Sequence, residues 1–474
     1  MMKNKKNNDK FIIFLVFFLL FAFLSWIFGA HIYQSGELIP AGMRRAGLYD
    51  LLVYMISGFT YKFETVLYIL SVGGIYGILV NTESYKKVVH KVTDFIKGKE
   101  KIVFAVLTFF IAVYTSMSMD IMALFFLVPF IMTVFLRAGQ DKLTAVSASF
   151  GGMFIGYLGQ TVGDYGSSFL IELFKITATS GIIAKTIIFI LAYVLYNVFA
   201  ILHMNSSKEE DEEESADMFA VSDLKKVVKK RDKVSAIPLV VIAIISLIII
   251  MIGYIPWNTS FNITFFDTVH TAVTSVKIAG IAIFKELFGP SMTAFGTWTN
   301  MLPAVFILLI GTFIVGKSAK LTINEMITYF GKGVRKISSV ALIFGLAYSI
   351  FYLYTAYPWP TSLINKFLNP ESFNIVMILI AAILSVIFCA DPLFSGYYFG
   401  SYFTTLYASN AIATSIIWRI GNALALLVGP TSFLLLVALV YADVPYTKWL
   451  KYIWKFVGAF VIVSLISLAI MIYI

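Results

Sequence analysis

The chain contains several apolar stretches that are each long enough to cross a lipid bilayer. A helix needs about 20 apolar residues to span the hydrocarbon core. Of the 474 residues only 13% are charged, whereas an average soluble domain has about 25%. The sequence therefore predicts a polytopic membrane protein. The clearest stretches are Phe11–Tyr33, Gly181–Met204, Ile237–Trp257 and Val457–Ile474.

We expect the first of these stretches to remain in the mature protein as a membrane helix. It follows a basic start with Lys3, Lys5 and Lys6, as the apolar region of a signal peptide would. Its apolar run is longer than the usual length of about 7 to 15 residues, however, and no A-x-A cleavage pattern follows.

The ionisable residues argue against several other classes of protein. The formal charge of +10 lies beside apolar segments and not in a soluble basic domain, so we expect no nucleic-acid partner. The single Cys389 cannot form a disulfide within the chain. We also expect no catalytic residues, no metal site and no bound cofactor, and therefore no enzyme. The histidines, which lack metal-ligand spacing, are His31, His90, His203 and His270.

One segment has the composition of a solvated connector. In residues 205–234 the acidic run Glu209–Glu214 precedes a basic stretch with Lys225, Lys226, Lys229, Lys230 and Arg231, and such a block repels itself and stays in water. We therefore predict an N-terminal membrane repeat (1–204), a charged linker (205–234) and a C-terminal membrane repeat (235–474). Because basic flanks favour the cytoplasm, the N-terminus and the linker are expected on the cytoplasmic side of a multi-pass cell-membrane protein.

The two halves show weak internal symmetry. Phe95–Ile102 matches Phe330–Ile337 at five of eight positions. Further pairs share one constant offset, among them Gly159 with Gly429 and Thr161 with Thr431. We expect an all-α fold of about 10–12 transmembrane helices in two inverted repeats with re-entrant hairpins and broken helices.

An inverted repeat would place equivalent basic clusters on opposite sides of the membrane, which the charge rule disfavours. Amphipathic helices lying in the interface, at Tyr85–Lys99 and Leu321–Lys336, would soften this conflict. A parallel repeat is the alternative.

Polar and small residues interrupt the apolar segments at corresponding places in the two halves. Within hydrocarbon such breaks are tolerated mainly where they are buried in protein or line a watery cavity. A broken helix offers free amide N–H groups that suit a carboxylate, and free carbonyls that suit Na⁺ or a proton-carrying group. Close helix packing is the alternative role for the small residues. The predicted solute-binding residues are Ser116, Gly159, Gln160, Thr161, Ser395, Arg419, Asn422, Gly429, Thr431 and Ser432.

Three ionisable residues lie within apolar surroundings, where a charge costs at least about 2.5 to 3.5 kcal/mol. Arg419 could bind a carboxylate of the solute through its fork of donors. It could instead pair with Asp391 or Asp120, or reach toward an interface. Asp120 and Asp391 are predicted to couple transport to H⁺ or Na⁺ or to bind an amino group of the solute, and capping of a following helix is their alternative role. Asp164 could simply face water.

Several motifs are similar to those of one carrier family. The strongest are Phe330–Ala347 and Gly429–Ser432 followed by Val444–Lys451, while Leu70–Gly77 and Ala138–Thr144 are less specific. Through them most of the chain resembles the YfcC family of carriers, relatives of the DcuC anaerobic C4-dicarboxylate carriers in the ion transporter superfamily. The resemblance implies an inverted-repeat fold, a scaffold with a mobile transport unit, elevator-like secondary transport and a homodimer.

The same resemblance implies dicarboxylates, amino acids (notably basic ones) or short peptides as solutes, but the chain departs from the family pattern at the expected site. Asp120 alone stands for an acidic pair, Gly163–Asp164 replaces Asn-Pro, and Arg419 with Asn422 stand where relatives tend to carry Gln and Asp. The substrate is therefore not carried over from the family.

Together these observations predict a secondary active transporter of a small carboxylate-bearing solute. It would be a symporter coupled to H⁺ or Na⁺, or an exchanger, in contact with the lipid bilayer and its solute. An ion or solute channel is the main alternative, because a channel also tolerates polar breaks. A membrane-embedded enzyme would need a catalytic set, and a purely structural role gives no reason for the intramembrane charges.

Overall fold

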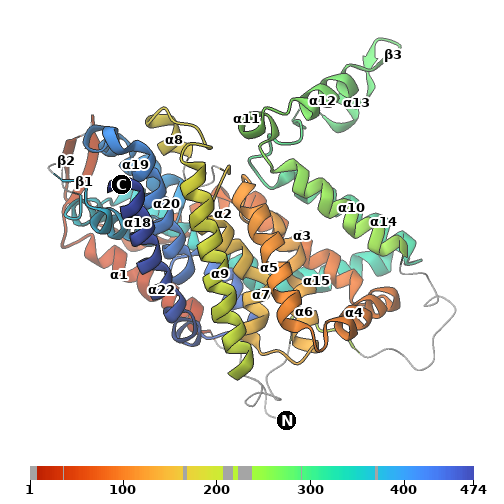
Figure 1. Cartoon of the computed structure of the whole chain (residues 1–474). Coiled ribbons are helices and arrows are strands. Elements are labelled where there is room, and N and C mark those ends of the chain that lie inside the picture. Colours follow the sequence, from red (N-terminus) through yellow and green to blue (C-terminus); the bar gives the residue numbers. More distant parts are fainter. Residues whose placement is uncertain are drawn as a thin grey trace.

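The computed structural model describes residues 8–35, 37–163, 168–206, 217–222, 237–289, 291–368 and 372–473, which are mostly helical (Figure 1). Within those ranges the strands form two short antiparallel hairpins, β1–β2 (Ala30–Gln34, Glu37–Gly42) and β3–β4 (Lys277–Ile278, Ile281–Ala282). The predicted all-α class is confirmed.

Among the helices before the linker, the first packs against the C-terminal part of the chain and the last is a long membrane helix. They are α1 (Asp9–Leu24), α2 (Leu48–Tyr61), α3 (Phe63–Leu79), α4 (Glu83–Ile96), α5 (Glu100–Met117), the 3-10 helix η1 (Ala123–Leu127), α6 (Val128–Arg137), α7 (Lys142–Leu158), α8 (Ser168–Leu173) and α9 (Ile182–Ser206).

The helices after the linker include several short ones and end with the longest. They are α10 (Ile237–Gly253), α11 (Trp257–Phe261), α12 (Phe265–Ser275), α13 (Ile283–Phe288), α14 (Leu302–Ser318), α15 (Ile323–Ala347), α16 (Ser349–Ala356), α17 (Pro360–Asn365), α18 (Ile375–Cys389), α19 (Pro392–Leu406), the 3-10 helix η4 (Ala408–Asn410), α20 (Ala411–Val428), α21 (Phe433–Ala442) and α22 (Tyr446–Tyr473).

The described residues contain enough apolar helix for a polytopic membrane protein. Five helical segments are long and apolar enough to cross a membrane, and the pair α2–α3, bent by 66°, makes a sixth. Four shorter apolar helices accompany them in the described ranges, so the number of helices that can span a membrane is smaller there than the expected number of about 10–12. The five long segments are Glu100–Met117, Ile182–Asn205, Ile323–Ala356, Ala408–Ala442 and Tyr446–Ile472.

Equivalent helices in the two halves pack in the same way. A Cβ atom on Gly152 of α7 would lie 2.6 Å from Ile111 Cβ, and one on Gly156 would lie 2.5 Å from the carbonyl oxygen of Ala112. Residue numbers therefore rise together in α5 and α7, which run parallel. In the second half α18 and α20 are also parallel. Gly421 of α20 packs against Ala382 of α18, and Thr431, further along the chain, bonds Ile387, which is further along α18.

The two equivalent units run in opposite directions. Tyr196 of α9 contacts Phe456 of α22 (ring centroids 5.3 Å apart), whereas Phe199 contacts Tyr452 (4.7 Å), so these helices are antiparallel. Figure 1 shows α9 descending from α8 as α22 ascends to the C-terminus.

The α7 and α20 helices are antiparallel as well. Arg419 of α20 contacts Gln160, just after the end of α7. Trp449 contacts both Phe154 of α7 and Leu427 of α20, so residue numbers rise in opposite directions along the two helices. The arrangement agrees with an inverted repeat and not with the parallel alternative.

The resemblance motifs at Leu70–Gly77 and Phe330–Ile337 pack against each other across α3 and α15. A Cβ on Gly333 would lie 2.0 Å from the carbonyl oxygen of Gly73, and one on Gly77 would lie 2.3 Å from that of Tyr329. No other residue type permits this approach of two backbones. These glycines therefore have a structural role.

Three predicted helix boundaries were wrong: those of two expected membrane helices and that of one expected interfacial helix. The helix expected over Phe11–Tyr33 ends at Leu24, because the Ser25 hydroxyl turns back to the carbonyl of Ala22 and accepts the N–H of Ala46, and β1 follows. The stretch Ile237–Trp257 is helical only to Gly253, which packs under Trp298.

The interfacial helix expected at Leu321–Lys336 does not form a separate helix. The one expected at Tyr85–Lys99 does, and it is α4. The Leu321–Lys336 segment continues into α15 without a break, from a capping box in which Thr322 and Glu325 bond each other's backbone N–H groups. Residues 323–336 contain no proline that would end a helix.

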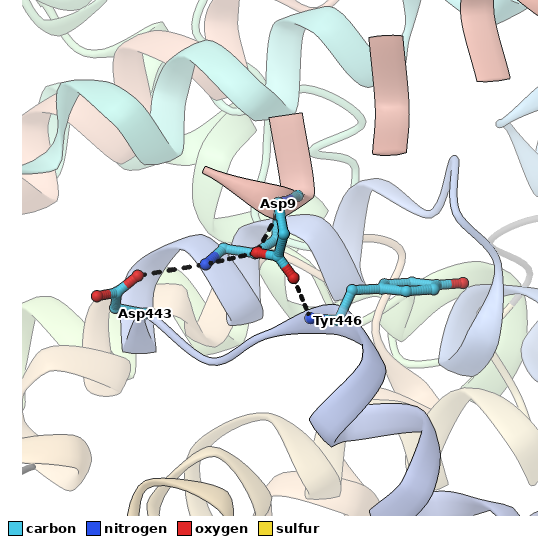
Figure 2. Close-up of polar contacts among 4 residues, drawn as sticks. Asp9, Asp443 and Tyr446 are labelled. Carbon is cyan, nitrogen blue, oxygen red and sulfur yellow. Dashed lines mark hydrogen bonds and ion pairs between the residues drawn. The ribbon is translucent and has the colours of Figure 1, made fainter. Parts of the chain in front are cut away.

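The start of α1 is fixed to the turn before α22 (Figure 2). The Lys10 ammonium lies 3.1 Å from the Asp9 carboxylate and 3.2 Å from that of Asp443, with its side chain only 2% exposed. The second Asp9 oxygen accepts the backbone N–H of Tyr446 at 2.8 Å. The beginning of α1 and the beginning of α22 therefore lie at the same end of the molecule.

The described part of the linker, residues 217–222, is docked on the helices. Phe219 is fully buried, with its ring 5.7 Å from that of Tyr76. The Asp217 carboxylate accepts the Thr133 hydroxyl, and Arg137 donates to the carbonyl of Val221 at 2.8 Å. The expected solvated connector is thus anchored at these residues, while Glu209–Glu214 and the basic residues 225–231 lie outside the described ranges.

Docking of residues 217–222 should weaken as the pH rises. Burial raises the pKa of the Asp217 carboxyl above its ordinary range, against the hydrogen bonds from Thr133 and Phe219 that lower it. A raised pKa in the docked state means that the protonated form docks best, so stability present at low pH is lost as the pH rises through the raised value. Hydrogen exchange of the 217–222 amides, corrected for intrinsic rates, should show falling protection, and Asp217→Asn should remove the trend. Equal protection at all pH values in the native chain would contradict the expectation.

Candidate functional site

The first predicted break is closed by contacts between the ends of α5 and α7. The carbonyl oxygen of Ser116 accepts the backbone N–H groups of Thr161 (3.0 Å) and Gly163 (3.1 Å). The Ser116 and Thr161 hydroxyls lie 3.2 Å apart and bond each other. The structure thus brings these two predicted site residues together, with α5 holding the residues that follow α7. Asp164 lies outside the described residues.

Gly159, at the end of α7, also permits close packing. A Cβ at this position would lie 2.4 Å from the Cα of Phe189 on α9. Lys185, which is also on α9, is buried and donates to the carbonyls of Ala178 and, at 3.5 Å, Thr161. The packing interpretation of this glycine therefore has direct support, and Lys185 is a second cation at the break that sequence reasoning did not assign to the site.

The second predicted cluster joins α19 to α20. The side-chain amide of Asn422 donates to the Ser395 hydroxyl at 3.0 Å, and the indole N–H of Trp418 donates to the same hydroxyl at 3.2 Å. All three side chains are buried. The structure therefore brings together Ser395 and Asn422, both predicted to bind the solute, and Trp418 was missed because a tryptophan in an apolar run looks like any core residue.

Thr431 and Ser432 stabilise the second break itself. The Thr431 hydroxyl donates to the carbonyl of Ile387 at 2.7 Å. The Ser432 hydroxyl caps α21 by accepting the N–H of Leu435 at 3.1 Å. Gly429 has little space, since a Cβ would lie 2.5 Å from the carbonyl oxygen of Ala425. These residues shape the break between α20 and α21.

Arg419 connects the two units. Its guanidinium Nη1 donates to the carbonyl oxygen of Gln160 at 2.7 Å, and both residues are almost fully buried, with 3% and 1% exposed. A helix of the second half thereby contacts the break of the first half.

Asp120 and Asp391 occupy equivalent positions in the two units. Asp391 comes 271 positions after Asp120, close to the 270 that separate Gly159 from Gly429. Asp391 caps α19 by accepting the backbone N–H of Leu393 at 2.8 Å, whereas Asp120 accepts that of Met122 at 2.7 Å in the turn before η1. The capping role is therefore real at Asp391, and Asp120 holds a turn. Asp120 is 9% and Asp391 1% exposed.

Lys62 is a charged neighbour of both aspartates. It lies between α2 and α3 at their 66° bend and interacts electrostatically with Asp120 and Asp391. Asp120 also interacts with Glu64 and with Asp391. Sequence reasoning missed Lys62 and Glu64, although a charged pair interrupting the apolar residues 48–79 was a usable signal.

Comparisons with known proteins identify one family. The family described as "DcuC: C4-dicarboxylate anaerobic carrier" matches residues 42–473. A solved structure of Neisseria gonorrhoeae MtrF, whose title describes a class of antimetabolite efflux pumps, is 12% identical, with 98% of this chain and 95% of that chain covered and a TM-score of 0.40. The Alcanivorax borkumensis YdaH transporter is 14% identical, with 96% and 97% covered and a TM-score of 0.38. No curated protein matches.

Proposed function

Because the chain belongs to the DcuC family of C4-dicarboxylate anaerobic carriers, we propose that it is a secondary transporter that binds a small carboxylate-bearing solute between its two inverted units. A C4-dicarboxylate is the first candidate, and amino acids and short peptides are the others. Family membership supports a carrier embedded in the membrane. The solute, the coupling ion and an elevator-like motion belong to the proposal.

The contact between Arg419 and Gln160 carries this proposal. It places a buried guanidinium at the point where the two units meet. A solute carboxylate that displaced the Gln160 carbonyl could take two parallel hydrogen bonds from the guanidinium fork. The nearby Ser116 and Thr161 hydroxyls and the Asn422 amide would complete the polar surroundings.

The two equivalent aspartates are proposed to carry the coupling ion. Asp120 and Asp391 are buried carboxylates that influence each other electrostatically, and Lys62 acts on both. Buried carboxylates at membrane depth are typical of proton relays and of cation sites in transporters. The proposal leaves H⁺ and Na⁺, and symport and exchange, to the experiment below.

The orientation and assembly predicted from the sequence are part of the same proposal. The start of α1, the docked residues 217–222 and the turn before α22 lie at one end, which we place on the cytoplasmic side with the rest of the linker. The outward face of α1 exposes Ile12, Val16 and Phe23 at 57–61%. This face would contact lipid or, in the homodimer that the resemblance implies, a second copy.

Substrate counterflow in proteoliposomes tests the proposed function. The labelled panel contains C4-dicarboxylates, basic and neutral amino acids and dipeptides, with Na⁺ and pH gradients imposed separately. We expect saturable exchange of one class, accelerated by unlabelled solute on the opposite side, because a carrier must cycle with its solute bound.

Two results would contradict this function. Flux that does not saturate and is not accelerated by solute on the opposite side would indicate a channel. No exchange of any panel member by folded protein would remove the carboxylate-bearing solute from the proposal.

A further inference from the structure

A cavity of about 520 Å³ opens between the two antiparallel membrane helices α9 and α22. It lies near the start of α7, at the end of the molecule where α9 meets the linker. Its wall combines three lysines of α22 with apolar and aromatic residues of α9. The residues used below are Phe199, Leu202, His203, Lys448, Lys451 and Lys455.

The charge of this cavity is strongly positive. Lys448, Lys451 and Lys455 follow one another by three and four residues, which places them on one face of α22. No carboxylate is among the described residues that line the cavity. Asp141, which contacts the lining residue His203, accepts His203 Nε2 at 3.1 Å and the N–H of Thr144 at 3.0 Å.

The lysines lie at the depth of lipid headgroups. The membrane-capable segment Tyr446–Ile472 has 27 residues, which corresponds to a helix of roughly 40 Å, whereas the hydrocarbon core measures about 30 Å. The surplus falls on the first turns of α22, because the residues that follow them, Val457–Ile474, carry no charge. Trp454 supports this depth, because it is 62% exposed beside Lys455 and aromatic residues of this kind favour the interface.

The other wall of the cavity is apolar and open to the bilayer. Leu202 is 62% exposed, and Phe199 lines the cavity beside it. Only 39% of the α9 span and 22% of the α22 span are buried within the protein, so both helices present much of their surface to lipid. An occupant that matches both walls carries a negative headgroup and a hydrocarbon chain.

We propose that this cavity binds an anionic phospholipid, whose phosphate lies against Lys451 and Lys455 and whose acyl chain follows Phe199 and Leu202 into the bilayer. Basic pockets between membrane helices are sites of this chemistry. The site is separate from the breaks that carry Arg419 and the two aspartates, and its occupancy does not depend on the proposed transport function.

Native mass spectrometry of the purified full-length protein tests the site, with phosphatidylglycerol, cardiolipin or phosphatidylcholine added at matched concentrations. We expect the anionic lipids to bind in preference to phosphatidylcholine. The double variant Lys451→Gln/Lys455→Gln should bind them roughly 30-fold more weakly, since each lysine near an anionic lipid contributes about a factor of five. Both lysines are exposed, so the variant should fold normally.

Two matched variants separate this site from general attraction. Lys97→Gln/Lys99→Gln removes the same charge from exposed positions that do not line the cavity and should leave binding unchanged. Leu202→Ser should weaken the binding of lipid and leave the binding of inorganic phosphate unchanged.

Three outcomes would overturn the proposal. These are equal loss in the Lys97/Lys99 variant, unchanged binding in the Lys451/Lys455 variant, and displacement of the lipid by inorganic phosphate at equal concentration, which would indicate a site for soluble anions.

Discussion

Arg419→Gln should abolish solute binding while leaving the protein folded. The variant keeps a polar donor at about the position of the guanidinium Nε, two bonds short of the Nη1 that donates to the Gln160 carbonyl at the junction of the two units. It removes the positive charge that would pair with a carboxylate. Losing one partner of a buried charge pair costs about 2–5 kcal/mol, so the half-saturating solute concentration should rise by roughly 30-fold or more.

The measurement is counterflow as a function of solute concentration, accompanied by the thermal unfolding midpoint of the same sample. Arg419→Lys preserves the charge but not the planar fork, and it should bind with intermediate affinity. Arg335→Gln, which neutralises an exposed arginine of α15, is the matched control and should transport normally. Normal counterflow by Arg419→Gln would show that the guanidinium does not contact the solute.

Asp391→Asn and Asp120→Asn should each disconnect transport from the ion gradient. Asparagine caps a helix about as well as aspartate, so the hydrogen bonds from Leu393 and Met122 can persist and the fold should be retained. The loss is confined to the negative charge. One pH unit across the membrane can drive about tenfold accumulation for each coupled proton, and this accumulation should vanish in a variant that has lost its coupling carboxylate.

Comparison of gradient-driven uptake with counterflow identifies the residue, because counterflow needs no net ion movement. The coupling variant should retain counterflow and lose accumulation under whichever gradient, Na⁺ or pH, drives the native protein. Glu64→Gln tests the neighbouring carboxylate and should leave coupling in place. Full accumulation by both asparagine variants and by their combination would remove the aspartates from the coupling mechanism.

The sequence predicted the breaks better than the boundaries of the helices. Gly159, Thr161, Gly429 and Thr431 do stand at the ends of α7 and α20, because small and polar residues within an apolar run have few other places in a membrane protein. The end of α1 was not predictable in the same way. Residues 25–34 remain apolar enough for a helix, and the contact of Ser25 with the distant Ala46 decides against it.

The charged surroundings of the site were only partly predictable. Arg419 and Asp391 stood out because they lie within apolar segments. Lys62 was overlooked although, with Glu64, it interrupts an apolar stretch, whereas Lys185 lies near the start of a segment, where a lysine ordinarily reaches water. Only the 66° bend between α2 and α3 and the packing of α9 on α7 bring these two cations inward.

The opposed directions of the two units restrict how a solute can lie between them. If the two inverted units were identical, a half-turn about an axis in the membrane plane would exchange them, and a bound molecule could lie between them in either of two orientations. Here the position equivalent to Arg419 is Ser149, whose hydroxyl bonds the carbonyl of Ala145 at 2.8 Å within its own helix. The guanidinium therefore has no counterpart at the equivalent position of the first unit. A solute with two unlike ends would be held in a single polarity throughout the cycle, and it would leave the protein in the same alignment in which it entered.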